Sequence, residues 1–222
     1  LLEMLADSGK LMEDQLIMAL NDPRPSNRRT AIRCAEKIAT PSDKLIAAMI
    51  AKVDDPDAQV RYQLALTLPQ VAAGQAGSPL AKILQKSPSD SWTQSAVLLA
   101  SQLNPAQLLE AILESRTAPK ELRPFATRLA DLAVRAGKGS NADSLLRFLT
   151  KHLTDDGYAL STGAFEGILQ AMRSTQPTFR DWLAKSSGPD SPTREFYHRY
   201  LQSLATMATD AKQPLSQRLY AT

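Results

Sequence analysis

Few side chains in this sequence have the types and spacing that catalysis or metal binding needs. Cys34 is its one cysteine, and His152 and His198 are its two histidines, among 222 residues. A thiol–imidazole pair would need Cys34 beside a histidine, and a zinc site needs several imidazole or thiolate ligands. A free cysteine within an apolar stretch is typical of a small buried hydrophobe. The sequence therefore predicts no enzyme, no metal site and no cofactor.

Other chemical motifs find equally little support. Serine hydrolases place their nucleophile in a sharp Gly-x-Ser-x-Gly turn, and the chain has no such motif. Neither histidine is followed by the glutamate of the paired His-Glu motifs found in metal-dependent hydroxylases. The carboxylate pairs Asp54-Asp55 and Asp155-Asp156 lie where a helix ends, so we expect solvated, helix-capping turns there.

The Gly-Lys-Gly-Ser-Asn segment at 137–141 is the only candidate for a phosphate cradle. It lacks the spacing of a P-loop. We expect Gly137 to close one helix and Ser140 or Asn141 to cap the next.

Composition points to helices. The chain holds 32 Ala and 32 Leu but only 9 Gly, which excludes collagen-like and low-complexity chains. Its longest uncharged stretch, residues 91–109, contains Ser, Thr, Gln, Asn and Pro and would be costly in lipid. Residues 1–111 carry 11 basic and 12 acidic side chains, and residues 112–222 carry 15 and 11. This small excess of positive charge does not favour a nucleic-acid partner.

The chain repeats itself at an interval near 33 residues. Residues 21–31 and 54–64 both place Asp-Pro before an arginine, Arg28 in one and Arg61 in the other. Weaker copies follow, with Thr93 and Arg123 as anchors. Small or apolar residues recur three and seven positions after each anchor, on one stripe of a helix: Ala31, Leu64, Ala96 and Ala126, then Ala35, Leu68, Ala100 and Ala130.

Each unit is predicted to hold two helices joined by a turn. Apolar residues at helical spacing predict first helices at 45–53 and 145–153, a second helix at 164–172 and a last long helix at 193–209. No run of alternating β-branched residues competes with this interpretation. The expected fold class is all-α, a right-handed α-solenoid of about six stacked helix pairs forming one domain over residues 1–222.

The Asp-Pro turn, the Val60-Arg61 pair and the small-residue stripe together resemble a HEAT repeat. That resemblance implies a curved stack with a surface for a protein partner, and it implies a ladder between repeats made by Asp22, Arg28, Asp55, Arg61 and Arg123. The third unit has Ser87 and Thr93 at the ladder positions. We expect the ladder to be interrupted there, with apolar packing by Trp92 instead.

The chain is also similar to the helical middle region of large bacterial membrane-bound dehydrogenase-like proteins. The resemblance rests on residues 54–73, a Trp-bearing unit and the ending Pro-Leu-Ser-Gln-Arg at 214–218. It implies a preceding propeller, a following c-type cytochrome and an exported location; without that parent, a cytoplasmic location is expected. Residues 1–5 already have the apolar pattern of a helix, and residues 214–221 resemble the start of another repeat. We therefore expect the chain to be a fragment of a longer array of repeats.

The expected function is a non-catalytic scaffold for protein contacts or domain spacing. Polar residues beside the stripe would form its partner-binding face: Arg29, Arg33, Tyr62, Gln94, Arg128 and Arg135. The alternative is a DNA-binding or DNA-glycosylase-like HEAT protein. It would use Trp92 and Trp182 with Asp90 and Asp181, but the two tryptophans lie about three repeats apart.

Overall fold

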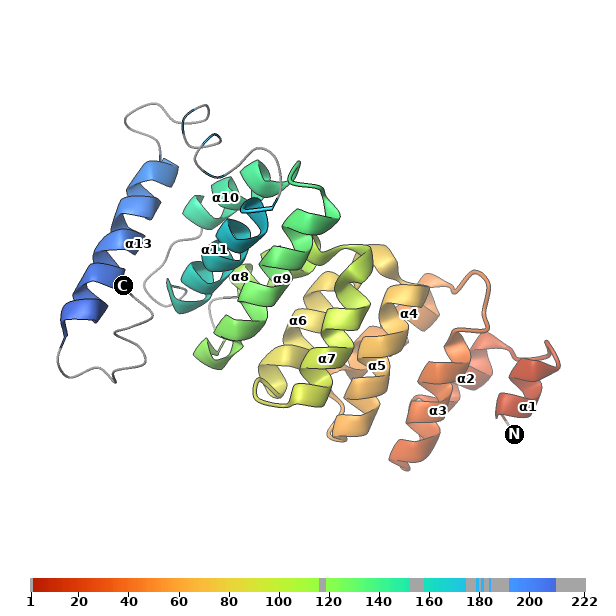
Figure 1. The fold of residues 1–222 in the computed structure, drawn as a ribbon. Helices are drawn as coiled ribbons and strands as arrows, with labels where there is room; N and C mark the ends of the chain where they lie inside the picture. Colours follow the sequence, from red (N-terminus) through yellow and green to blue (C-terminus); the bar gives the residue numbers. More distant parts are fainter. Residues whose placement is uncertain are drawn as a thin grey trace.

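The computed structural model describes residues 2–115, 119–151, 158–174 and 192–210, together with residues 179, 181 and 184. Every regular element in these ranges is a helix, and the helices stand side by side in an elongated row from α1 to α13 (Figure 1). Four short 3-10 helices, at 51–54, 73–75, 101–103 and 120–122, join or extend them. The α-helices are α1 (Leu2–Asp7), α2 (Glu13–Ala19), α3 (Pro25–Ala35), α4 (Asp43–Ile50), α5 (Ala58–Val71), α6 (Gly77–Lys86), α7 (Ser91–Ala100), α8 (Pro105–Glu114), α9 (Arg123–Ala136), α10 (Ala142–Lys151), α11 (Tyr158–Met172) and α13 (Pro192–Thr209).

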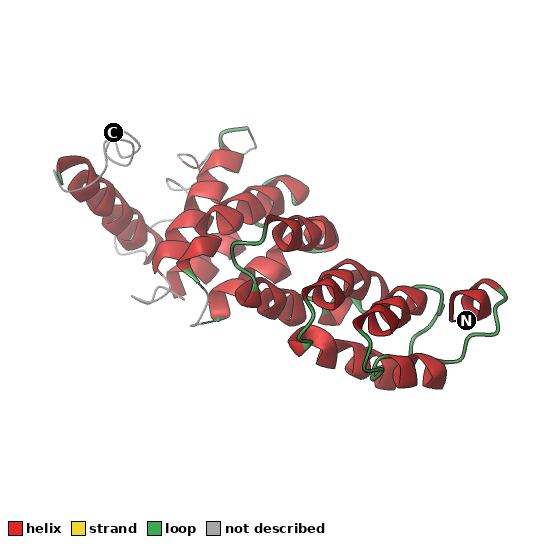
Figure 2. Ribbon diagram, turned by 90° about the horizontal axis from the view of Figure 1, so that it is seen from below, coloured by secondary structure: helices red, strands yellow, loops and turns green. Residues whose placement is uncertain are grey.

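The helices pair as the repeat predicts. Each first helix packs on the second helix of its own unit, in the pairs α2/α3, α4/α5, α6/α7, α8/α9 and α10/α11. Second helices also contact those of the next unit, as α3 does α5 and α5 does α7, so the pairs form two layers (Figure 2). The predicted all-α solenoid is confirmed.

Local chemistry sets where the second helices begin. Pro25 is at the first turn of α3, where its missing N–H costs no hydrogen bond. The Asp57 and Asp90 side chains cap α5 and α7 by accepting hydrogen bonds from the second and third backbone N–H groups of each helix. The turn before each of these helices holds a proline, Pro23, Pro56 or Pro88.

The small-residue stripe faces the core. Seven of its eight members are at most 3 % exposed, and the eighth, Ala100, is partly exposed. Small side chains at this stripe let neighbouring helices approach closely, since protein interiors are close-packed. Cys34 is buried beside Ala35, and burial raises the pKa of its thiol, which keeps it neutral.

The row of second helices is not uniform. The second helices α7 and α9 make few contacts with each other, whereas the first helices α6 and α8 pack together and connect the third and fourth helix pairs. Leu98 and Gln102 line one side of a shallow cleft here, and Arg128 and Asp131 line the other. Among the described second helices, successive neighbours therefore make their weakest contact between α7 and α9.

Candidate functional site

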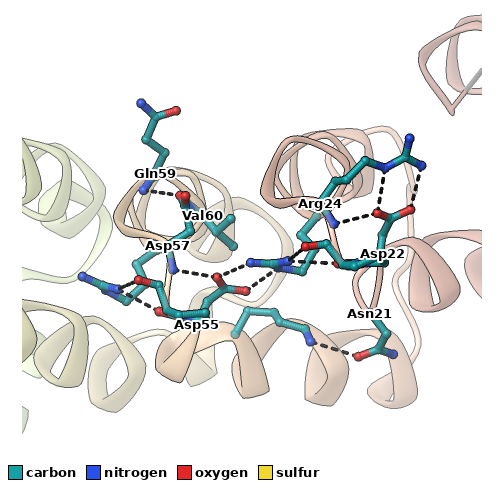
Figure 3. A network of polar contacts seen from close by, with 12 residues as sticks. Asn21, Asp22, Arg24, Asp55, Asp57, Gln59 and Val60 are labelled. Carbon is teal, nitrogen blue, oxygen red and sulfur yellow. Dashed lines mark hydrogen bonds and ion pairs between the residues drawn. The ribbon is translucent and has the colours of Figure 1, made fainter.

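The best-defined polar cluster lies between the first two repeats (Figure 3). Arg28, on α3, donates two hydrogen bonds to the Asp55 carboxylate, from Nε at 2.7 Å and from Nη2 at 2.8 Å. Its third nitrogen, Nη1, donates to the carbonyl oxygens of Asp22 (2.9 Å) and Pro23 (3.0 Å) in its own turn. One guanidinium thus fastens its own Asp-Pro turn and holds the turn of the next repeat.

Asp55 is fully engaged by these contacts. Its side chain is 3 % exposed, and Oδ1 also accepts a hydrogen bond from the backbone N–H of Asp57 at 3.0 Å. Burial alone would raise the pKa of Asp55, but the hydrogen bonds from Arg28 and Asp57 and the charge of Arg28 outweigh it and lower that pKa. The sequence predicts a solvated, capping pair at Asp54-Asp55. In the structure Asp54 is exposed, but Asp55 is buried, and Asp57 caps α5 instead.

The contact between the second and third repeats has weaker polar bonds than the contact between the first two. Arg61 fastens its own turn through the carbonyl oxygens of Asp55 (2.7 Å) and Pro56 (3.2 Å), but across the step it meets only the Ser87 hydroxyl, at 3.3 Å. A serine therefore stands where the preceding step has a carboxylate. An exposed ion pair between Lys86 and Asp54, at 2.8 Å, also spans this step.

The third unit is shifted by one residue relative to the anchors inferred from sequence. Counted from the helix starts, Arg28 and Arg61 are the fourth residues of α3 and α5, and the fourth residue of α7 is Gln94, not Thr93. Gln94 donates from Nε2 to the Pro88 carbonyl oxygen at 2.6 Å, as the arginines do in their turns. Gln94 thus has the position in its turn that Arg28 and Arg61 have in theirs. It is half-buried and is not an exposed residue of a partner-binding face.

The other two ladder candidates have different partners. The Asp22 carboxylate binds within its own turn, to Arg24 and to Asn27, and these hydrogen bonds lower its pKa. Arg123 is the first residue of α9, so it lies one turn earlier in its helix than Arg28 does in α3. It forms an ion pair with Glu166 of α11.

α11 packs on α9 more closely than any other helix pair among the described residues. A Cβ atom on Gly163 would lie 2.8 Å from the Arg123 carbonyl oxygen, and one on Gly167 would lie 2.1 Å from that of Thr127. Neither position has room for a side chain. Two glycines four residues apart fall on one helix face, and this spacing is a signal in the sequence for a close contact, although it does not say which helix faces it.

Three of the predicted partner-binding residues come together in one groove. Arg29 and Arg33 of α3 and Tyr62 of α5 line an open groove of about 520 Å³ that crosses α3, α5 and α7. Gln59, Gln63, Asp90, Ala58 and Trp92 complete its lining. We call this the α3–α7 groove.

Trp92 is the residue that the sequence argument placed wrongly. We expected it to pack between repeats, but it is 72 % exposed and lines the groove. It is the second residue of α7, two residues after the capping Asp90, a position occupied by exposed Ser26 in α3 and exposed Gln59 in α5. Counting from the helix starts would have placed it on this face.

Arg128 and Arg135 lie apart from this groove, on α9. Both are exposed; Arg128 lines the cleft beside α7, and Arg135 is held by Asp131 at 2.8 Å and by the Ser174 hydroxyl at 2.8 Å. The six predicted face residues therefore do not form one row.

The residues considered for catalysis remain apart where they can be placed. Cys34 is in α3 and His198 in α13, at opposite ends of the row (Figure 1), while His152, Trp182 and Asp155-Asp156 lie outside the described residues. Within the described ranges no three His, Cys, Asp or Glu side chains are grouped as metal ligands would be. Gly137 ends α9, and Asn141 donates to the Ala133 carbonyl oxygen of that same helix.

No helix in the described part of the chain is both long and apolar enough to span a bilayer.

Comparison with known proteins agrees with the geometry of the first repeats. A family model described as HEAT repeats matches residues 13–102, from α2 to the short helix after α7. Neither the curated proteins nor the solved structures contain a match. The match supports a HEAT-repeat helical family over residues 13–102, which include the second helices α3, α5 and α7.

Proposed function

We propose that this chain is a scaffold of HEAT-like repeats that docks a protein partner in the α3–α7 groove. The observation that carries the proposal is Trp92, which is 72 % exposed beside Arg29, Arg33 and Tyr62. Exposing a tryptophan to water is unfavourable, and Trp, Tyr and Arg are the residues that contribute most to protein interfaces. A partner that covers Trp92 would turn this cost into binding free energy.

The test compares partner recovery by wild-type chain, by Trp92→Ala and by a matched control. Met18 is 76 % exposed on α2 and lines no part of the groove, so Met18→Ala removes a similarly exposed apolar side chain elsewhere. A protein recovered from an extract of the source cells is identified by mass spectrometry, purified and titrated against all three chains.

We expect the purified partner to bind wild type and Met18→Ala alike and to lose about tenfold or more in affinity with Trp92→Ala. Equal binding to all three chains would overturn the groove as the docking site. Catalytic turnover by the isolated chain, lost on replacing named residues, would overturn the scaffold role itself.

We further propose that the chain spaces domains within a larger redox protein of the dehydrogenase–cytochrome kind. This form of the proposal rests on the resemblance of residues 54–73 and 214–218 to such proteins. The sequence of the full gene product tests it. A propeller domain before the repeats and a Cys-x-x-Cys-His motif after them are expected, and the lack of both would overturn it.

A further inference from the structure

The α3–α7 groove carries positive charge that internal carboxylates leave available. Arg29 and Arg33 are four residues apart on α3, so their guanidinium groups lie on one face of that helix. Arg29 is exposed, and its hydrogen-bond partner is the amide oxygen of Gln59; no carboxylate pairs with it among the residues that the structure describes.

Arg33 already holds a carboxylate that can be displaced. It forms an ion pair with Glu3 of α1, and the two side chains are 58 % and 55 % exposed. Exposed pairs of this kind contribute little to stability, because water and salt screen them. Glu3 therefore occupies the position that a carboxylate of a bound segment could take.

The acidic residue that lines the groove is engaged elsewhere. Asp90 accepts hydrogen bonds from the backbone N–H groups of Trp92 (3.3 Å) and Thr93 (3.1 Å) and from the Thr93 hydroxyl. These bonds lower the pKa of Asp90 and place its charge at the positive N-terminus of α7. The two arginines are left to attract charge from a ligand.

We propose that the groove binds an extended acidic peptide segment that carries one large apolar side chain. This inference rests on the proposed function and names the chemistry of its partner. Carboxylates of the segment pair with Arg29 and Arg33, and its apolar side chain packs on Trp92 and Tyr62. An open groove across three helices suits a linear segment better than a small compact ligand.

Nucleic acid fits this surface less well. Phosphate backbones are bound by many Lys and Arg side chains along a continuous track. Here Arg29 and Arg33 are the two basic residues of the groove lining, and no lysine lies beside them there. A short segment with a few carboxylates matches two guanidinium groups and an aromatic surface.

The test measures fluorescence anisotropy of labelled peptide libraries with the purified 222-residue chain. One library flanks a central phenylalanine with glutamates, a second replaces the glutamates with glutamines, and a third replaces the phenylalanine with alanine. A labelled single-stranded oligonucleotide is the fourth probe. We expect the first library to bind about tenfold or more tightly than each of the others, and to weaken as salt is raised.

Variants locate the binding site. Arg29→Ala/Arg33→Ala and Trp92→Ala should each lower affinity for the acidic library about tenfold or more. Arg29→Lys/Arg33→Lys should keep most of it, because the charge remains. Arg199→Ala, at an exposed arginine of α13 paired with Glu195, and Met18→Ala are matched controls that should bind as wild type does. Circular dichroism checks that every variant is folded.

The two proposals fail differently. Equal binding of the glutamate and glutamine libraries, or tighter binding of the oligonucleotide, overturns the acidic segment. In the first case the groove stays a docking site if Trp92→Ala still abolishes binding. Binding of the acidic library that neither groove variant changes overturns the inference and the groove together.

Discussion

Two pairs of neighbouring second helices in this molecule, α3 with α5 and α9 with α11, are joined in different ways. Between α3 and α5, a buried guanidinium reaches from one repeat to the carboxylate of the next, through Arg28 and Asp55. Between α9 and α11, Gly163 and Gly167 remove side chains so that the backbones meet, and the Arg123–Glu166 ion pair lies beside that contact. The α3–α5 contact depends on paired opposite charges at the turns, and the α9–α11 contact depends on the lack of side chains at two positions of α11.

The difference predicts which substitution each region tolerates. A charge-paired contact should fail when one partner is removed but survive when both become apolar. A close backbone contact should fail when a single methyl group is added.

The largest effect is expected for Asp55→Ala. It leaves the Arg28 guanidinium, whose side chain is 10 % exposed, without its carboxylate, which costs about 3–5 kcal/mol of unfolding free energy. The double variant Arg28→Met/Asp55→Leu should lose much less, because it buries no unpaired charge. Urea denaturation of Arg28→Met, Asp55→Leu and the double variant measures the coupling between the two side chains.

Asp54→Ala is the matched control for Asp55→Ala. It removes the adjacent carboxylate, which is exposed and pairs with Lys86, so its urea midpoint should stay close to that of wild type. Additive losses in the Arg28–Asp55 cycle would contradict a charge-paired contact.

The next effect is expected at the close contact. In Gly167→Ala the new Cβ would lie 2.1 Å from the Thr127 carbonyl oxygen, so α9 and α11 must separate, at about 2–3 kcal/mol. Arg123→Ala should cost less, because it adds no atoms to the close contact and Glu166 keeps a hydrogen bond from the Tyr200 hydroxyl. Thermal and urea unfolding measure both.

Gly74→Ala is the control for the added methyl group. Nothing lies within 4 Å of the Cβ position at Gly74, so this change should leave stability nearly unaltered. If Gly167→Ala instead raised stability, by the roughly 1 kcal/mol that alanine gains over glycine inside a helix, the close contact would be refuted.

Acid should weaken the charge-paired contact selectively. The pKa of folded Asp55 lies below its unfolded value near 3.9. Its contribution to stability is therefore complete above about pH 4 and is lost as the pH falls through the folded value. The urea midpoint should fall between pH 6 and pH 3 by less in Arg28→Met/Asp55→Leu than in wild type; an equal fall would show that other carboxylates account for it.

The same comparison explains what could be predicted from sequence. Helix pairs follow from a repeated spacing, because equal spacing in a stack places equivalent residues at equivalent contacts. The pairing of Arg28 with Asp55 was expected from the resemblance to HEAT repeats. The α9–α11 contact could not be recognised that way. Glycine spacing becomes informative only when the helix facing it is known.

Some of the residues that line the groove were named from sequence for a related reason. Arg29, Arg33 and Tyr62 were assigned to an exposed face from their offsets within two regular units. In the third unit the interval from the turn's Pro88 to the fourth residue of α7 is one residue longer than in the preceding turns, so the anchor fell on Thr93. That shift placed Gln94 on the exposed face and Trp92 in the contact between repeats. In the structure Gln94 bonds within its own turn and Trp92 is exposed.

The smallest effect tests this shifted register directly. Gln94→Ala removes the hydrogen bond to the Pro88 carbonyl oxygen and should cost about 1 kcal/mol. Gln94→Glu should cost more at neutral pH, because a carboxylate cannot donate to that carbonyl and would face it with like charge. Ser95→Ala is the control: Ser95 is exposed and bonds only within its helix, to Ser91, so its loss should be hard to detect in urea denaturation. If Gln94→Ala and Ser95→Ala are equally silent, Gln94 does not fasten the turn as Arg28 and Arg61 do, and the α7 register belongs with Thr93 after all.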